Sequence, residues 1–417
     1  MNSINRHDSR KGPPKLFLMG YNGANNTGSE ARLLAIIEDI RAVLGNDVDI
    51  TVPTLNPDNL RRYLKEGPHL RIALFPSIFH LALRRLVKEH DIVLLVEGSC
   101  YMDYWSSALL WAFLWVSKCA YKFNKPNMAY AVDSGPLSQK NQNKVQKIAS
   151  NTDLIIARTE ATKEHLKGIG VTAPFEVTAD TGFTFSMNPK DKRIMKRIWD
   201  NAKNGVVGLS VLDFYLWPVV IRLWGNKKNC YRWPYYFSRG TENCMASAEL
   251  ANKWAKEADR IIEKYNKSIA FICMEQLDEP ITMEIHRKMK HSKQARIFSS
   301  RNYNASQMTG ILRGLDLLVT SRYHGSVLSL AVQIPQVAFG QDTRLRRLYR
   351  DLDLYDDYFI EEKSTNRWER LRDDVDRLLT EPTLQKEKLR VGFQEHLARA
   401  KRNRVLLKDF VTKYWYS

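Results

Sequence analysis

The chain has 417 residues, about 44% of them apolar, and its 64 Lys and Arg against 46 Asp and Glu give a formal net charge of +18. This length exceeds what one hydrophobic core usually serves, so two domains are expected, and the composition excludes a disordered chain. The five cysteines have no CxxC spacing, and the histidines have no HxE or HExxH spacing. We therefore expect a reducing compartment, no disulfide framework and no metal site.

The first half of the sequence alternates short apolar runs with helical patterns. The stretch Trp105–Val116 is the most apolar, but it is shorter than the roughly 20 residues that span a bilayer, so it predicts a buried helix or, alternatively, a surface-attached one. The alternation predicts βαβ units and a mostly parallel sheet. Strands are expected at 15–19, 48–52, 92–96, 127–132 and 154–157, and helices at 30–44, 57–65, 81–90, 106–123, 139–150 and 161–169.

The same pattern restarts after a polar stretch at 188–193, and two helices end the chain. The fold class predicted is α/β and GT-B-like, with two Rossmann-like doubly wound domains facing a central cleft, followed by C-terminal helices. Strands are expected at 206–211, 268–274, 296–299, 317–320 and 336–339, and helices at 246–265, 282–289, 305–313, 326–332, 343–352, 366–379 and 382–414. The predicted parts are a flexible N-terminus at 1–14, domains at 15–190 and 191–360, and terminal helices at 361–417.

Between the first strand and the first helix lies the sequence GYNGANNTG, residues 20–28. Gly23 and Gly28 relieve steric limits on the backbone, and Asn25 and Asn26 tolerate left-handed conformations. Thr27 or Ser29 can cap the helix, with Glu30 in its first turn, and the helix N-terminus favours an anion. The spacing matches neither a P-loop nor the dinucleotide GxGxxG pattern. A plain strand-to-helix turn is the alternative.

A second loop, TSRYHGS at 320–326, follows the strand predicted at 317–320. Arg322 offers a planar fork for carboxylate or phosphate, and His324 can act as a proton donor or an anion ligand near neutral pH. Gly325 and Ser326 begin the next helix. An isolated histidine is most often structural, but an Arg-x-His-Gly set at a strand end favours a functional site.

Several stretches together resemble the polysaccharide pyruvyl transferase family, over about residues 15–360. The most specific is LLVTSRYHGSVLSLAVQIPQVAFGQD, which is similar to the Ser-Arg-aromatic-His-Gly turn and downstream Ile-Pro strand of the family. The others are GYNGANNTGSEARL, DIVLLVEGS, YAVDSGPLS, TDLIIARTEATKEHLKGIGV and VTADTGFTF. Two positions depart from the pattern, because Glu97 stands where glycine is expected and Arg344 where lysine is common.

The resemblance implies transfer of pyruvate from phosphoenolpyruvate to a sugar, usually as a ketal, with no cofactor besides this donor. Carried over residue by residue, it makes Arg158, Arg322 and His324 the catalytic candidates, with the 23–28 loop facing them across the cleft. His324 would donate a proton or stabilise phosphate. The substrate-binding candidates are Gly23, Asn25, Asn26, Gly28, Ser321, Gly325, Ser326, Glu97 and Arg344. Glu97, Asp103 and Asp133, at strand ends, are candidate bases for the acceptor hydroxyl, with structural roles as the alternative.

The segment 214–239, FYLWPVVIRLWGNKKNCYRWPYYFSR, alternates aromatic with basic residues. Aromatic faces stack on sugars, and an aromatic-basic surface also suits an anionic membrane. We expect contact with the acceptor, a saccharide that a lipid could carry, and a loop packed on the core is the alternative.

Rival functions are a GT-B glycosyltransferase using a nucleotide-sugar, a basic nucleic-acid-binding protein, and an inactive relative. For the first, Glu275 and Asp278 are the nearest candidates to hold a ribose. For the second, no RRM, KH or helix-turn-helix signature appears, so nucleic acid is not expected as a partner. Without an apolar signal segment the protein is expected to be cytoplasmic, with peripheral contact at the inner membrane surface left open. The sequence also leaves open a homo-oligomer.

Overall fold

The computed structural model of the protein describes residues 12–104, 106–216, 219–238 and 240–417. The chain divides into two compact units. Unit 1 contains the described residues up to Gly23, Arg32–Thr181 and Ala398–Ser417, and unit 2 contains Ala24–Ala31 and Gly182–Leu397. The division thus falls at 181/182 rather than at the predicted 190, and each unit includes part of the chain's last long helix. Most of the N-terminal segment predicted to be flexible lies outside the described residues.

Unit 1 is built on a seven-stranded sheet in the order β3-β2-β1-β4-β5-β6-β7, in which each neighbouring pair is parallel. The strands alternate between two cores, because successive side chains of a strand point to opposite faces. Leu16 and Leu18 belong to one core, and Phe17 and Met19 to the other. The strands are β1 (Leu16–Met19), β2 (Ile50–Thr54), β3 (Leu70–Leu74), β4 (Ile92–Leu95), β5 (Asn127–Val132), β6 (Leu154–Ala157) and β7 (Phe175–Val177).

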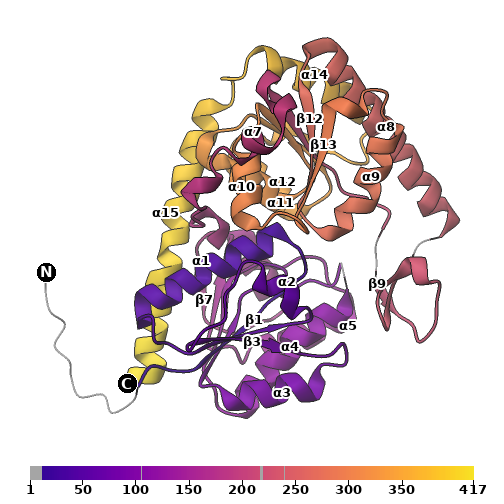
Figure 1. Ribbon diagram of the computed structural model, residues 1–417. Coiled ribbons are helices and arrows are strands. Elements are labelled where there is room, and N and C mark those ends of the chain that lie inside the picture. The colour runs from indigo at the N-terminus through magenta and orange to yellow at the C-terminus, as the bar shows by residue number, and fades with distance from the viewer. Residues whose placement is uncertain (1–11, 105, 217–218, 239) are drawn as a thin grey trace, which may run out of the picture. The chain divides into compact units, whose positions relative to one another are not determined.

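Helices cover both faces of this sheet (Figure 1). The first core includes Leu33, Ile36 and Ile40 of α1, and the second includes Leu110 and Phe113 of α4. The apolar stretch of α4 is therefore a buried helix, as predicted, although Trp105 lies outside the described residues. Within the part of the chain that the structure describes, no helix has the length and hydropathy needed to cross a bilayer. The helices are α1 (Thr27–Leu44), α2 (Pro57–Arg61), α3 (His80–Glu89), α4 (Ser107–Lys122), α5 (Gln139–Ala149) and α6 (Glu160–Gly168).

Unit 2 contains a six-stranded parallel sheet in the order β13-β12-β8-β14-β15-β16. Numbered within the sheet, this order is 3-2-1-4-5-6, the order of a doubly wound dinucleotide-binding fold. A separate antiparallel sheet has the order β10-β11-β9. The strands are β8 (Val206–Ser210), β9 (Val219–Ile221), β10 (Cys230–Arg232), β11 (Tyr235–Phe237), β12 (Ser268–Cys273), β13 (Ala295–Ser299), β14 (Leu317–Thr320), β15 (Gln336–Gly340) and β16 (Phe359–Glu361).

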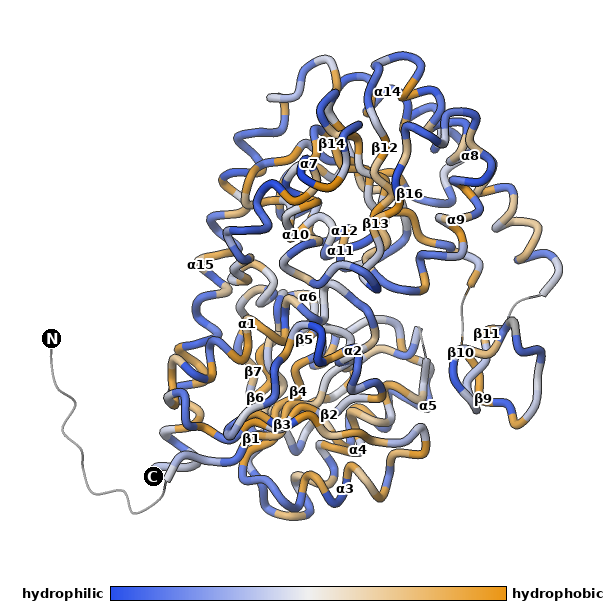
Figure 2. The backbone as a smooth tube through the Cα atoms, in the orientation of Figure 1, coloured by the Kyte–Doolittle hydropathy of each residue, from blue (hydrophilic) through white to orange (hydrophobic). Residues whose placement is uncertain are grey.

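Helices flank the six-stranded sheet, with α8, α9 and α14 on one side and α10 to α12 on the other (Figure 1). Arg260 of α8 pairs with Asp376 of α14, and the rings of Trp254 and Trp368 lie 5.1 Å apart across the same two helices. Apolar segments gather at the strands and polar ones on the outer turns (Figure 2). The helices are α7 (Ile194–Ile198), α8 (Thr241–Tyr265), α9 (Glu279–Lys288), α10 (Ala305–Leu312), α11 (Tyr323–Ser329), α12 (Thr343–Asp351), α13 (Tyr355–Tyr358), α14 (Arg367–Thr380) and α15 (Lys386–Val411).

The sequence analysis missed six strands, and these are short or lie at sheet edges. β3, β7 and β16 are outer strands, where side chains reach solvent and the apolar run that marks a buried strand is absent. β9, β10 and β11 lie inside the aromatic-basic segment, where aromatic residues and proline obscured the alternation. This segment is therefore a small sheet rather than a loop, with 217–218 and 239 outside the described residues.

Asp374 gives a prediction for α14, because it lies on the buried face with Leu371 and Val375. Burial raises the pKa of Asp374 to about 6. This folded-state pKa lies above the unfolded value of about 3.9. The stability that the protonated carboxyl contributes is therefore complete below about pH 3.9, and it is lost as the pH rises through 6. We expect Asp374→Asn to raise the Tm by about 2–5 °C near neutral pH and by less near pH 4.5 in thermal unfolding.

The matched control is Asp373→Asn, because Asp373 is exposed on the same helix. A gain in Tm for Asp374→Asn that does not change with pH would contradict the explanation by burial.

Candidate functional site

The strand order of each sheet reverses at one point, and ligands of open α/β sheets bind beyond the strand ends there. In unit 1 this point lies between β1 and β4, which lead into the loops at 20–26 and 96–99. In unit 2 it lies between β8 and β14, which lead into the loops at 211–214 and 321–324. Two of the sequence motifs, at 20–28 and at 320–326, thus begin at these places.

The segment Ala24–Ala31 belongs to unit 2, the same unit as Arg322 and His324. It forms an antiparallel bridge at the end of β12, in which the Thr27 N–H donates to the Met274 carbonyl (2.8 Å) and the Gln276 N–H donates to the Asn25 carbonyl (3.2 Å). The hydroxyl of Ser300 also donates to the Asn25 carbonyl (2.5 Å). The sequence analysis had this loop facing the catalytic candidates across a cleft, whereas these contacts place its residues 24–28 in the same unit as Arg322 and His324.

Asn26 starts helix α1, since its side-chain oxygen accepts from the Ser29 N–H (3.0 Å). The prediction that Thr27 or Ser29 caps this helix is therefore wrong. Asn25, just before the cap, has a left-handed φ of 49°, which asparagine tolerates better than most residues. Glu30, 1% exposed, accepts from the Ala305 N–H at the start of α10 (3.0 Å).

Gly28 touches the ring of His324. A Cβ at position 28 would stand 2.1 Å from the Nδ1 of His324. The two atoms would clash at this distance, so one of the two residues would have to move. The imidazole also meets the ring of Tyr323 in a T-shaped contact, with centroids 5.0 Å apart and the planes at 78°. Glycine at 28 is therefore required by the position of the imidazole, which brings together two predicted site residues almost three hundred positions apart.

Arg344 is placed next to this aromatic pair. Its guanidinium lies over the Tyr323 ring, 6.0 Å from the centroid, and binds the carboxylate of Asp342 through Nη2 (2.6 Å). Asp342 also caps α12, because its carboxylate accepts from the Arg344 N–H (2.8 Å). The charge of this predicted substrate-binding arginine is thus already paired with a carboxylate.

Arg322 is held by two carboxylates. Its Nε donates to both oxygens of Asp278 at 3.1 Å, Nη2 also binds Asp278, and Nη1 lies 3.2 Å from Glu275. Asp278 is 0% exposed. Burial alone would lower the pKa of Arg322, but the charges of Asp278 and Glu275 raise it above its ordinary value. The three groups carry a net charge of −1, so Arg322 is not a free clamp for an anion. Asp278 binds Nε and Nη2, and Nη1 contacts Glu275, which is 6% exposed.

The other predicted residues of this turn are engaged within the fold. The Ser321 hydroxyl donates to the Phe339 carbonyl (2.5 Å), and the Ser326 hydroxyl donates to Gln336 in the core. The Gly325 and Ser326 N–H groups donate to the Arg322 carbonyl, at 3.0 and 3.4 Å. The hydrogens of these groups form the turn and the first bonds of α11, and the expectation that the groups bind the donor substrate stays a prediction.

In unit 1, Arg158 belongs to a buried network rather than to an open site. Its Nε and Nη2 donate to Asp133 at 3.1 Å, and Nη1 binds Asp180. Arg32 also binds Asp180 (2.7 Å) and donates to the Ala131 carbonyl (2.9 Å). All four charged side chains are at most 1% exposed. The network is neutral and fully desolvated, with Arg158 bound to two aspartates, and the catalytic role of Arg158 stays a prediction.

Sequence reasoning missed Arg32 and Asp180. A signal for Arg32 was present, because it lies four and eight residues before Ile36 and Ile40 on the apolar stripe of α1. A charged residue in such a stripe needs a buried partner. Asp180 lay within a quoted motif, but nothing in the sequence shows which arginine it meets.

Gly98 borders this network, since a Cβ there would stand 2.8 Å from Arg32 Nη1 and 2.9 Å from Arg158 Nη1. The neighbouring Glu97, 7% exposed, accepts from the Tyr21 N–H (3.3 Å) and from the Gly98 N–H (2.8 Å). Its carboxylate therefore fixes the two loops at the switch point of this sheet.

Two more predicted residues of unit 1 hold loops in place. Gly23 has a φ of 73°, and a Cβ there would stand 2.3 Å from the Thr54 hydroxyl. Asp103 accepts from the Ser138 N–H (3.0 Å) and from Asn141 (2.7 Å) at the start of α5. The structural alternative holds for both.

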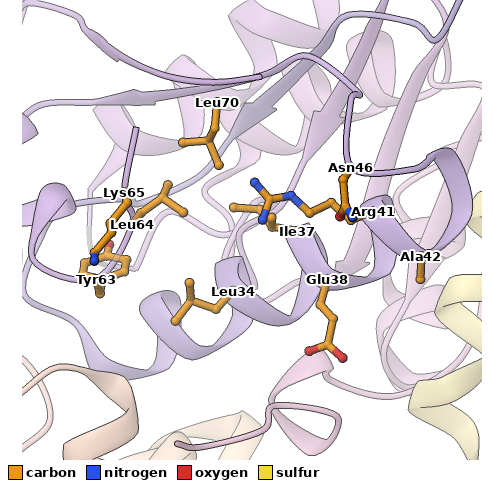
Figure 3. A pocket seen from close by; sticks show the side chains of 10 residues that line it. All are labelled: Leu34, Ile37, Glu38, Arg41, Ala42, Asn46, Tyr63, Leu64, Lys65 and Leu70. Carbon is orange, nitrogen blue, oxygen red and sulfur yellow. The ribbon is translucent and has the colours of Figure 1, made fainter. Parts of the chain in front are cut away.

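Unit 1 also contains a half-open cavity of about 530 Å³ between α1 and the segment from Tyr63 to Leu70 (Figure 3). Its apolar lining includes Leu34 and Ile37, and Arg41 and Lys65 bring positive charge. The Tyr63 hydroxyl accepts from the Gly23 N–H (3.2 Å), which ties the cavity wall to the end of the loop after β1. This cavity was not anticipated from the sequence. The full lining is Leu34, Ile37, Glu38, Arg41, Ala42, Asn46, Tyr63, Leu64, Lys65 and Leu70.

Comparison with known proteins gives both a family and a fold. The pattern of the family described as polysaccharide pyruvyl transferase matches residues 26–343. This chain belongs to the polysaccharide pyruvyl transferase family, as the sequence resemblance predicted, and so to a family of transferases. No curated protein matches the chain.

Solved structures with a similar fold include complexes with UDP-glucose and with UDP, and a UDP-GlcNAc 2-epimerase. HepE of Anabaena in complex with UDP-glucose is 12% identical, with 96% of this chain and 98% of that one covered and a TM-score of 0.57. MnaA of S. aureus in complex with UDP is 9% identical, with 96% of each chain covered and a TM-score of 0.61. The UDP-GlcNAc 2-epimerase of Methanocaldococcus jannaschii is 14% identical, with 87% and 91% covered and a TM-score of 0.56. These likenesses confirm the GT-B-like fold class predicted from the sequence.

The buried network of unit 1 gives a stability prediction. Arg158→Ala would leave Asp133 desolvated without its guanidinium, so we expect the free energy of unfolding to fall by about 3–5 kcal/mol in urea titration. The control is Arg85→Ala, which breaks an exposed pair with Glu89 and should cost less than about 0.5 kcal/mol. Equal losses for the two variants would rule out a structural role for Arg158.

Proposed function

We propose that the chain transfers the pyruvyl group of phosphoenolpyruvate to a sugar of a polysaccharide or of its lipid-linked precursor, forming a pyruvate ketal. Membership of the polysaccharide pyruvyl transferase family supports the transferase class and a saccharide acceptor. The donor is the one that resemblance to this family implies, and the arginine and histidine of the turn after β14 are residue types that suit its phosphate and carboxylate.

The observation that carries the proposal is the His324 imidazole, which contacts both Gly28 and Tyr323 at the end of β14, the switch point of the second sheet. An imidazole titrates near neutral pH and so can deliver a proton. The packing against Tyr323 and Gly28 restricts the orientation of the ring. Arg322, two residues earlier, supplies a guanidinium whose planar edges suit phosphate or carboxylate.

The proposed reaction needs a proton donor and an anion site. His324 protonates the methylene carbon of the enol, and the adjacent carbon becomes oxocarbenium-like. A sugar hydroxyl attacks that carbon, phosphate leaves, and a second hydroxyl of the sugar closes the ketal ring. Arg322 Nη1 would turn from Glu275 to the donor, while Asp278 keeps the other edge of the guanidinium in place.

The second candidate function is transfer from a nucleotide-sugar. Its support is the fold, because HepE with UDP-glucose and MnaA with UDP share it. The same basic surface would attract a diphosphate, and Glu275 or Asp278 would hold a ribose. Arg322 already occupies both carboxylates, which favours the first function.

The test of the proposed function compares ligands and variants. In calorimetric titration at moderate salt, we expect saturable binding of phosphoenolpyruvate, with inorganic phosphate weaker and UDP-sugars not bound. His324→Gln should lower the turnover of pyruvyl transfer by about 10²–10⁴-fold if His324 is the general acid, while donor binding persists. Gly28→Ala should lower turnover similarly, because its Cβ displaces the imidazole. Product is measured as a mass increase of the acceptor.

The control is His69→Gln, because His69 is an exposed histidine of unit 1 that pairs with Asp49. Saturable binding of a nucleotide-sugar, with no binding of phosphoenolpyruvate, would contradict the proposed function and support the second one. Arg322→Ala is a poor test by itself, because it leaves Asp278 buried without its partner and should cost stability as well.

Glu275 gives a second prediction for this site, because it competes with an anionic donor for Arg322 Nη1. Glu275→Gln removes the competing charge and keeps an oxygen that can accept from the Asp278 N–H. We expect the KM for phosphoenolpyruvate to fall by about 3–10-fold with kcat little changed, in steady-state kinetics. Glu279→Gln is the neighbouring control, since Glu279 pairs with Arg301 instead. A large fall in kcat for Glu275→Gln would make Glu275 a participant in the chemistry rather than a competitor.

A further inference from the structure

The antiparallel sheet of β9, β10 and β11 presents large apolar side chains to solvent. Trp224 is 79% exposed, Leu223 66%, Ile221 54% and Trp233 53%. The first three lie within four residues of one another, at the end of β9 and in the turn that follows. Exposed apolar clusters of this kind on soluble proteins usually mark an interaction site.

This exposure comes from an ordered arrangement of the sheet. The Trp233 indole N–H donates to the Leu223 carbonyl (3.2 Å), and the Arg222 N–H donates to the Pro234 carbonyl (2.9 Å). The rings of Tyr231 and Phe237 pack edge-on, 5.8 Å apart. The sheet therefore has its own internal packing, which holds the apolar side chains outward.

The charge around this cluster has one sign. Residues 214–241 contain five Lys or Arg and no Asp or Glu. Arg222 and Lys227 are exposed next to Leu223 and Trp224. Figure 2 shows the resulting alternation of apolar and polar segments along the small sheet. A surface of this composition complements a partner that is apolar within and negatively charged outside.

We propose that the β9–β11 sheet docks on the surface of a bilayer that contains anionic lipids. Ile221, Leu223 and Trp224 would enter the boundary between headgroups and acyl chains, where Trp is favoured, while Arg222 and Lys227 bind headgroup phosphates. A glycan or a nucleic acid offers stacking partners for Trp224, but neither gives Ile221 and Leu223 an apolar environment. The inference stands independently of the proposed function.

The experiment is flotation of the purified full-length protein with two kinds of vesicle. One is phosphatidylcholine alone, and the other contains roughly one third phosphatidylglycerol, an anionic lipid. We expect binding to the anionic vesicles only, weakened by added salt. Leu223→Ser/Trp224→Ser should weaken it by roughly tenfold or more. Arg222→Gln/Lys227→Gln should weaken it by about fivefold for each charge removed.

Two controls separate this surface from general charge and hydrophobicity. Leu81→Ser removes an apolar side chain of α3 that is 82% exposed, and Lys401→Gln/Lys408→Gln removes two exposed charges of α15. Both controls should bind like the unaltered protein. The proposal is overturned if anionic vesicles are not bound, if the α15 variant loses binding as much as the β9–β11 variants, or if single-stranded nucleic acid or a polysaccharide displaces the vesicles. Far-UV circular dichroism and Tm establish that each variant is folded.

Discussion

A guanidinium ion removed from water must meet a carboxylate, and this requirement organises both units of the protein. Arg158 follows β6 and Arg322 follows β14, and each is bound by an aspartate that is almost wholly buried. Removing either partner would leave a charge in a medium that cannot solvate it, whereas the complete pair is close to neutral in energy. The pairs therefore add little net stability but strongly favour one arrangement of the loops at the strand ends, which is the arrangement on which any substrate site there depends.

Arg158 and Arg322 differ in whether their ion pairs leave the guanidinium able to bind a ligand. Arg158 shares two aspartates with Arg32 in a neutral set of four, so neither charge is available for a ligand. Arg322 is the only cation in a set of three with Asp278 and Glu275, and Glu275 holds it through a single nitrogen. An anionic substrate could replace Glu275 at that nitrogen without disturbing Asp278. The same residue type at the end of a strand is thus a fixed part of the fold in one unit and an exchangeable contact in the other.

Much of the architecture follows from the sequence, because buried parallel strands are runs of apolar residues and the helices between them carry apolar stripes. For β5 and β6 the predicted limits agree with the structure to the residue. Two edge strands escaped for different reasons, because exposed residues interrupt the apolar run of β3, whereas β16 has only three residues. At the site, sequence singled out Gly28, Arg322 and His324 but not their partners. A motif gives residue types at a strand end. The contact of Gly28 with His324 depends in addition on where helix α1 starts. The roles of Ser326 and Arg158 depend on which groups their side-chain hydrogens bond to in the folded protein.

The pairing of arginines with carboxylates also shows where the net charge of +18 lies on the protein. The buried arginines contribute nothing to it, because each lies with at least one carboxylate, and many exposed arginines are also paired, as in Arg287 with Glu284. Positive charge accumulates where carboxylates are missing from the sequence, and one such stretch is the segment around β9–β11, which has five basic residues and no acidic one. There the charge is exposed beside Trp224 and Leu223 instead of being neutralised inside the fold. A polymerising or lipid-linked acceptor would be met at a membrane surface, so a basic, apolar surface on the transferase would bring the enzyme and such an acceptor to the same place.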